Sequence, residues 1–568
     1  MVISIREAPV AKDPSANSDS LSGAGLPDRK RVPVANSATA SNGHDGDGSS
    51  TDPDQIDALI AGAGANGNGW RGNGRGPGGR GPGGGRGRPG GPGGPAWRDR
   101  DLTNGSIPKN LWGMSWPQAV EGMMRVVDQM LDLIWAGFLG TPHIAGIGVA
   151  QQYTQMAWTA RQGIDTAQRA MVSRAIGMGN IGLARLSVYQ AATVTTVFWV
   201  LIAALGILLT EPMLLLLGVP DNVIDKAVPY MRVQFAGQGF MAFQQLSNQA
   251  LVASGDPLTP MRSQIVSRIC HGLLSPILVF GPGPFPGFGI AGAPMAAATG
   301  NAIAMGLNCR VLFSARSMLH LKFSDYRIEP KLIWQILRIG GPAAINGAER
   351  SIAQLVMVAF VTPFGDNALA AFTLSRRVEM FANLGSQGFG QASGVIVGQN
   401  LGAGKPTRGR ATILWALGFV VSIKGALSLL LFMFPSVVLQ LFTRDPELLA
   451  LASSWVRIQC LGNIAMGANN VFQQSFMTAG ATVWPMLVTL LGLWGLELPL
   501  AYVFSQPLGM DALGIAYATL IASTARPLLH LPYFLSNRWM RARVFNDQLV
   551  AGARPGQPDP IPVGPYSA

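Results

Sequence analysis

Long apolar stretches recur along the chain from Leu111 to the neighbourhood of Ser536, and short stretches of Gly, Pro and charged residues separate them. The runs Thr193–Leu217 and Ala411–Phe442 are each long enough to cross the hydrocarbon core of a bilayer, which takes about 20 helical residues. A backbone surrounded by lipid must satisfy its own hydrogen bonds, and a helix does so within one segment. The pattern therefore predicts an all-α integral membrane protein.

We expect twelve membrane-spanning helices. Their approximate ranges are 111–137, 144–172, 184–218, 227–253, 258–281, 288–316, 331–361, 368–398, 411–442, 448–478, 483–506 and 511–536. Lys and Arg are concentrated in the loops after the second, fourth, sixth and eighth of these segments and in the C-terminal tail. Cytoplasmic loops carry an excess of Lys and Arg, so both termini are expected in the cytoplasm, with the chain a multi-pass protein of the cell (inner) membrane.

The composition changes sharply before the first apolar segment. Charged residues make up only 13% of the 568-residue chain, against ~25% in soluble domains. The tract Trp70–Pro95 is mostly Gly, Arg and Pro, which cannot bury enough apolar surface to fold. It resembles the Arg-Gly segments of RNA-binding proteins. Nothing else in the chain indicates nucleic acid, so we favour a solvated basic tail near an anionic membrane surface.

The two halves of the apolar region align when 225 is added to the residue number. The matches fall on helix ends, turns and prolines in one register, among them Pro117 with Pro342, Gly163 with Gly388, Gly179 with Gly404 and Gly255 with Gly480. One break is expected near Pro212 and Pro435, where the offset is 223. The repeat predicts two six-helix lobes related by a pseudo-two-fold axis along the membrane normal, as in parallel-repeat transporters.

Four divisions of the chain follow from these patterns. They are a disordered Gly/Arg/Pro-rich cytoplasmic tail at 1–105, an N-lobe at 106–325, a C-lobe at 326–545 and a C-terminal tail at 546–568. Small-molecule substrate and membrane lipid are the expected partners, and we expect a monomer.

The segment Ala368–Arg410 is similar to the second-half signature of the multidrug and toxic compound extrusion (MATE) family, in particular to its DinF-like bacterial branch. Its most specific part is Val397–Lys405, with the sequence VGQNLGAGK. Ala136–Gly140 resembles the end of the family's first helix, and the resemblance extends over roughly Leu111–Arg543. It implies an antiporter that exports small organic compounds, cationic ones among them, driven by a proton or sodium gradient and needing no cofactor or metal.

Four charged residues of the first predicted helix share one stripe. Their spacings are 4, 3 and 4 positions: Glu121, Arg125, Asp128 and Asp132. Charges inside a span are costly, so the stripe is expected to face the bundle interior or a water-filled cavity. Arg125 can pair with Glu121 and with Asp128, which leaves Asp132 the least compensated. We assign Asp132 as the ion-coupling carboxylate, where the family resemblance also expects one, and Asp128 as second candidate. The alternative is an interhelical salt-bridge stripe.

The fifth predicted helix departs from the family pattern. Relatives often carry an Asn and an Asp four residues apart before a Pro, and the matching residues here are His271 and Ser275, before Pro276. His271 can share a proton with Asp132, or it can replace the Asn as a neutral hydrogen-bonding group. Because one carboxylate is missing, the resemblance favours protons over sodium as the coupling ion.

Further polar residues inside the predicted spans are candidates for the substrate cavity: Glu121, Arg125, Gln152, Gln245, Asn248, Glu349, Glu379 and Glu497. Glu349 lies next to a position where some relatives have a functional Glu, although Arg350 falls there in our register. Glu379 is expected in an ion pair near the outer mouth, whereas Glu497 has no evident partner nearby in the sequence.

Two other functions remain open. A membrane-embedded enzyme would usually show clustered His or Asp residues or a nucleophile beside a base, and the 5 histidines are scattered. No Cys spacing suggests a metal site. A lipid-linked precursor flippase of the wider superfamily is the second alternative, and twelve spans with the VGQNLGAGK segment favour the exporter over it.

Overall fold

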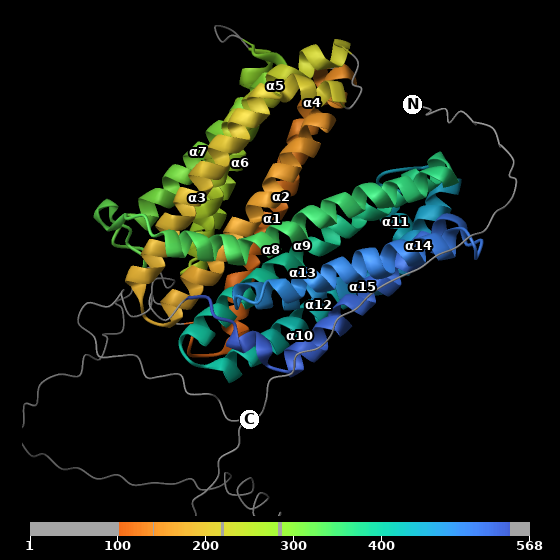
Figure 1. The fold of residues 1–568 in the computed structure, drawn as a ribbon. Helices are drawn as coiled ribbons and strands as arrows, with labels where there is room; N and C mark the ends of the chain where they lie inside the picture. The colour runs from red at the N-terminus through yellow and green to blue at the C-terminus, as the bar shows by residue number, and fades with distance from the viewer. Residues whose placement is uncertain (1–101, 140, 217–220, 282–286, 546–568) are drawn as a thin grey trace, which may run out of the picture. The chain divides into compact units, whose positions relative to one another are not determined.

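The structure is a computed structural model that describes residues 102–139, 141–216, 221–281 and 287–545 (Figure 1). All described residues belong to one compact unit, within Pro89–Ala568. Some side chains within the described helices, including those of residues 127–139 and 141–152, lie outside the description.

The described residues form helices and no strands. The first half comprises α1 (Ile107–Leu139), α2 (Thr141–Gly177), α3 (Ile181–Leu208), α4 (Thr210–Leu216), α5 (Asp221–Ala253), α6 (Leu258–Phe280) and α7 (Gly292–Leu312). The second comprises α8 (Pro330–Val361), α9 (Asp366–Gly402), α10 (Pro406–Met433), α11 (Pro435–Leu439), α12 (Pro446–Thr478), α13 (Val483–Leu490), the π-helix η5 (Leu491–Glu497), α14 (Leu498–Ser505) and α15 (Asp511–Leu535). Short 3-10 turns lie at Gly289–Ala291, Phe323–Asp325, Thr362–Phe364 and Arg538–Arg541.

The long helices give twelve spans in the described part of the chain, since α13, η5 and α14 run on as one helix and α4 and α11 are short extensions. Six of these spans are apolar enough to qualify as membrane helices by composition alone. The predicted all-α membrane fold with six spans in each half is confirmed.

The repeat is visible in the helix boundaries. Adding 225 to the limits of α2, α3, α5 and α6 gives the limits of α9, α10, α12 and the continuous helix α13–α14. The turns repeat as well, because Gly255 and Gly480 both have a φ of 94°. A left-handed backbone of this kind favours glycine, which explains why the sequence match falls there.

The predicted break in the repeat near Pro212 and Pro435 is wrong. The short helix α4 begins at Thr210 and α11 begins at Pro435, so the offset is 225 here too. Proline is tolerated anywhere in the first turn of a helix, where its missing N–H would have no partner. Pro212 is the third residue of α4 and Pro435 is the first residue of α11, so aligning the two prolines gave an apparent offset of 223 although the helices themselves are 225 residues apart.

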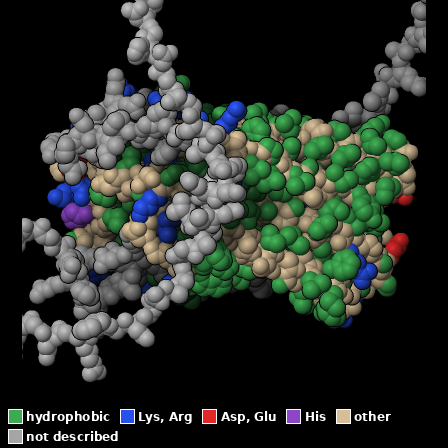
Figure 2. Space-filling view, turned by 90° about the horizontal axis from the view of Figure 1, so that it is seen from below, with side chains coloured by type: hydrophobic (Ala, Val, Ile, Leu, Met, Phe, Trp, Pro, Cys, Tyr) green, Lys and Arg blue, Asp and Glu red, His purple; other side chains and the backbone are tan. Residues whose placement is uncertain are grey.

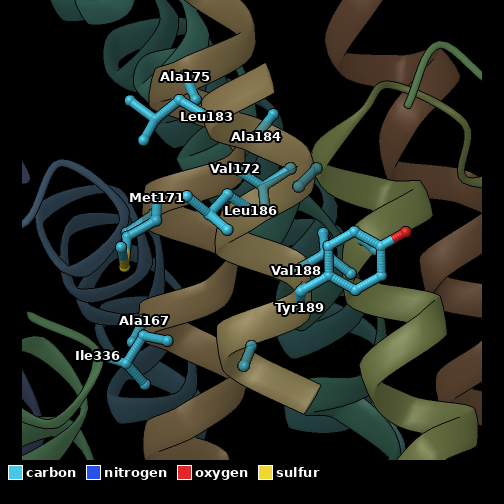
Figure 3. Close-up of a cluster of buried hydrophobic side chains, with 14 of the residues drawn as sticks. Ala167, Met171, Val172, Ala175, Leu183, Ala184, Leu186, Val188, Tyr189 and Ile336 are labelled. Carbon is cyan, nitrogen blue, oxygen red and sulfur yellow. The ribbon is translucent and has the colours of Figure 1, made fainter. Parts of the chain in front are cut away.

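The first turns of α1 and α8 pack into the opposite half. Leu111 and Met114 of α1 belong to a buried cluster formed mainly by α9, α10, α12 and α15. Ile336 and Ile339 of α8, their counterparts in the repeat, belong to the cluster of α2 and α3, where Figure 3 shows Ile336 beside Ala167. These exchanged ends tie the two halves together symmetrically.

Glycines allow the helices of the two halves to touch. A Cβ on Gly163 of α2 would lie 2.3 Å from the carbonyl oxygen of Gly340 on α8. The repeat-related contact exists too, because a Cβ on Gly388 of α9 would lie 2.6 Å from the carbonyl oxygen of Ser115 on α1. Pairs that map onto each other by the same offset are what a two-fold relation between the halves requires.

The outer surface is apolar. Figure 2 shows one face on which hydrophobic side chains form a broad area and charged side chains lie toward its margins. Exposed large hydrophobic residues come from both halves, for example Leu208 at 75% and Leu430 at 54% exposure. Such a surface is suited to lipid and not to water.

Candidate functional site

A chain of buried polar side chains fixes Glu121 of α1 inside the first half. Asn248 of α5 donates to Glu121 Oε1 at 3.2 Å and to Gln245 Oε1 at 3.2 Å. Asn308 of α7 donates to Asn248 Oδ1 at 2.6 Å. Glu121 and Asn248 are 7% and 1% exposed, so the carboxylate depends on these donors in place of water. The structure thus brings together three of the predicted cavity residues.

Arg125 is the nearest base to this carboxylate on its own helix. Its Nη2 lies 3.9 Å from Glu121 Oε1, and its guanidinium lies 5.9 Å from the centre of the Trp158 ring. The predicted pairing of Arg125 with Glu121 is therefore confirmed. Arg268 of α6 also acts electrostatically on Glu121.

The remaining first-half candidates divide into two groups. The side chains of Asp128, Asp132 and Gln152 lie outside the described part, although Asp128 and Asp132 belong to the continuous helix α1. His271 and Ser275 are fully buried on α6, a helix in contact with α1.

Three charged residues of α2 were missed in the sequence. Arg161 donates to Asp165 through two hydrogen bonds of 3.2 and 2.7 Å, and both side chains are almost completely buried. Arg169 Nη2 donates to Gln474 of α12 at 2.7 Å, which links the two halves. These three charged residues follow one another at intervals of 4, which places them on one face of α2, and this spacing could have identified them in the sequence.

A cavity of about 70 Å³ lies in the second half, between α8, α9, α12, η5 and α15. Two ion pairs line this cavity. Arg526 Nη2 donates to Glu497 Oε2 at 2.5 Å, and Arg376 Nη1 donates to Glu379 Oε2 at 2.8 Å. We refer to this space as the second-half cavity.

Glu497, which has no partner nearby in the sequence, pairs with Arg526 in the fold. Arg526 follows 29 residues later on the adjacent helix α15, so only the packing of α15 against η5 brings the two charges together. Glu379 forms an ion pair, as expected, and its partner is Arg376, while Asn383 donates to its other oxygen at 3.4 Å. This pair lies within α9 and in the cavity wall, well away from a helix end.

Two more buried charges belong to this half. Glu349 of α8 is 5% exposed, as expected for a candidate inside the bundle, and the side chain of Arg350 is outside the described part. Lys424 of α10, missed in the sequence, is 2% exposed and donates to Asn383 Oδ1 and, at 2.9 Å, to the Asn463 carbonyl oxygen.

The repeat relates the two polar regions. Adding 225 to Asp128 and Asp132 gives Ala353 and Met357, and both of these line the second-half cavity. Adding 225 to Glu121 gives Asn346, which donates to Thr489 at 3.2 Å within a neutral cluster. The halves therefore share a backbone but carry different charges at equivalent places.

Comparison with known proteins bears on this architecture. The MatE family model matches residues 117–277 and 342–503, one match in each half, and the two matches begin 225 residues apart. Together they cover more than half of the chain.

Relatives match along nearly their whole length. The chain is 26% identical over 405 residues to the probable multidrug resistance protein YoeA of Bacillus subtilis, covering 70% of this chain and 87% of that protein. It is 26% identical over 417 residues to the FAD transporter of Shewanella oneidensis, covering 73% and 92%.

Solved structures share the fold. A crystal structure of a MATE protein in the bent conformation superposes with a TM-score of 0.72 at 20% identity, covering 80% of this chain and 98% of that chain. A crystal structure of the Vibrio cholerae MATE transporter VcmN in the bent form superposes with a TM-score of 0.71 at 22% identity, covering 76% and 98%. With the family model, the repeat and the membrane fold in agreement, this chain belongs to the MATE family and is a multi-pass membrane transporter, not an enzyme.

Proposed function

We propose that this protein is a secondary active antiporter of the DinF-like branch. It exports small organic compounds, cationic ones among them, across the cytoplasmic membrane by alternating access, in exchange for protons. One observation carries the proposal: the repeat counterparts of Asp128 and Asp132 line a cavity, yet only the first half has carboxylates at these positions.

Asp132 is the coupling carboxylate of the proposal, and Asp128 is the second candidate. Met357, the counterpart of Asp132, is 5% exposed and belongs to the cavity wall. An acid at the equivalent place of the first half would stand beside a cavity and not in lipid, where it can exchange a proton. His271, buried on the neighbouring α6, is the group with which Asp132 would share that proton.

The side chains available to coordinate an ion in the first half favour protons over sodium as the coupling ion. A sodium site needs several oxygen ligands, as other hard cations do. The fifth span offers the His271 ring and the Ser275 hydroxyl in place of a second carboxylate. Of the cavity candidates, Asn248 already donates hydrogen bonds to both Gln245 and Glu121.

Topology follows from charge. Arg174, Lys405 and Arg408 lie at one end of α2, α9 and α10, and an excess of bases marks the cytoplasmic end. Both termini are then cytoplasmic, with a tail at 1–105, lobes at 106–325 and 326–545 and a C-terminal tail at 546–568. We expect a monomer in contact with lipid, and unchanged transport after deletion of residues 1–104 would support a passive tail.

Small-molecule export is preferred to lipid-linked precursor flipping. Relatives are named for multidrug resistance and, in one case, for transport of FAD, and both drugs and FAD are small molecules. A flipping assay on reconstituted protein separates the two functions.

The first test is dye efflux from liposomes under a pH gradient without sodium. Wild type should export a cationic dye, Asp132→Asn should not, and Asp366→Asn, which neutralises an exposed acid at the start of α9, should match wild type. Efflux that survives in Asp132→Asn would reject that assignment. Efflux that requires sodium at fixed pH would reject proton coupling, and no efflux under either gradient would direct the search to lipid-linked substrates.

A further inference from the structure

We infer that the second-half cavity binds a zwitterionic group, an ammonium and a carboxylate carried by one small molecule, through exchange with the Glu497–Arg526 ion pair. The inference rests on the proposed function, since it assigns a substrate class to the exporter. The carboxylate of the ligand pairs with Arg526 and its ammonium pairs with Glu497.

The pair is buried but faces the cavity. The side chains of Arg526 and Glu497 are 10% and 9% exposed, and both belong to the cavity wall. Arg526 uses Nη2 for Glu497, while its Nε is buried and has no hydrogen-bond partner among the described residues. A guanidinium at a cavity wall can donate charge-assisted hydrogen bonds to the carboxylate of a ligand.

The backbone is unusual at this place. Glu497 ends the π-helix η5, and π-helical turns are rare and frequently occur at functional sites. Gly492 in the same turn leaves room for Arg526, because a Cβ there would lie 2.7 Å from Arg526 Nε. The missing side chain at Gly492 thus lets Arg526 pack directly against the helix that carries Glu497.

The ion pair is not required by the fold. Its repeat counterparts in the first half are Gly272 and Asn301, which carry no charge, and the same span is there a regular α-helix. Buried ion pairs are weak stabilisers compared with apolar packing. A charged pair that only one of two equivalent helices retains is therefore better explained by a ligand.

Charge balance selects the ligand class. The cavity wall holds two acids and two bases, Glu379 with Arg376 and Glu497 with Arg526, so it is neutral as a whole. A cation at Glu497 would displace Arg526 and leave a buried charge unpaired, and an anion at Arg526 would do the same to Glu497. A zwitterion replaces both partners at once and leaves every charge paired.

The test uses three fluorescent probes that differ only in charge. Nε-dansyl-lysine is a zwitterion, its methyl ester is a cation, and its Nα-acetyl derivative is an anion. Binding to the purified full chain is measured by dansyl fluorescence for wild type and for E497Q/R526Q, which removes both charges and leaves neither unpaired. R327Q/E329Q is the matched control, since that pair is more exposed and neither residue lines the cavity.

Wild type and the control should bind the zwitterion roughly tenfold more tightly than either derivative, and E497Q/R526Q should bind all three within about threefold. An unchanged preference in E497Q/R526Q, or a wild type that binds the ester equally well, overturns the inference. Efflux of the ester from liposomes under a pH gradient is followed in parallel. If wild type does not export the ester, the proposed function is contradicted. The ratio of the affinities for the zwitterion and its derivatives tests only the binding site.

Discussion

Gly177 and Gly402 meet where the last turns of α2 and α9 cross. A Cβ on Gly177 would lie 2.0 Å from the carbonyl oxygen of Gln399, and a Cβ on Gly402 would lie 2.2 Å from that of Arg174. The two contacts exchange under the offset of 225, so the relation between the halves runs through this crossing. No residue with a Cβ fits at either position without moving the two helices apart.

We therefore expect G177A and G402A each to lower the free energy of unfolding by about 1–3 kcal/mol, the usual cost of overpacking, and to slow transport. Thermal unfolding in detergent and dye efflux measure the two effects. G418A on α10 is the control, because a Cβ there meets nothing within 4 Å. Equal stability of G402A and G418A would contradict the close contact between α2 and α9 at this crossing.

The residues just before α1 are held by the second half. Lys405 Nζ donates to the Thr103 carbonyl oxygen at 3.1 Å, and Arg408 Nη2 donates to the carbonyl oxygens of Asn104 and Gly105 at 2.9 and 2.8 Å. Because α1 belongs to the first half, these bonds must break if the halves separate at this end.

K405Q/R408Q should therefore increase labelling of a cysteine introduced at Leu102, which is 1% exposed, in a chain from which Cys270, Cys309 and Cys460 have been removed. The expected increase in labelling rate is about tenfold, since two charge-assisted contacts of ~1.5 kcal/mol or less each are weakened. R410Q is the control, because Arg410 lies over the Phe534 ring and not on this segment. Equal labelling in both variants would refute the role of the contact.

Glu121 and Asn346 occupy equivalent places in the two halves, so E121N substitutes a side chain that the fold already accepts. The variant should remain folded but export dye about tenfold more slowly, because Asn248 and Arg125 lose the carboxylate that they contact. The reciprocal variant N346E tests whether the second half tolerates an acid there. Wild-type efflux in E121N would show that Glu121 is structural only.

Arg526→Met leaves the buried Glu497 carboxylate without its ion-pair partner. We expect a loss of about 3–5 kcal/mol in unfolding free energy, typical when one member of a buried pair is removed. The paired variant E497Q/R526Q should be less destabilised than the single one. Arg327→Met in the exposed pair with Glu329 should cost less than about 1 kcal/mol. A single variant as stable as wild type would mean that water reaches Glu497.

The class of fold and its symmetry could be predicted from local features of the sequence. Apolar length sets how many times a chain can cross a bilayer, and this property is local. The glycines at 179, 255, 404 and 480 marked the repeat because a left-handed turn tolerates little else, and all four have positive φ. The same local reasoning failed at Pro212 and Pro435, because the first turn of a helix accepts proline at more than one position.

Only the tertiary structure decided which charges meet. Arg125 with Glu121 and Arg376 with Glu379 were predictable because helical spacing of 4 or 3 places them on one face. The partners Arg526 with Glu497 and Arg169 with Gln474 come from different helices, separated by 29 and 305 residues. Their pairing depends on helix packing and on the π-turn at Leu491–Glu497, which no local pattern in the sequence encodes.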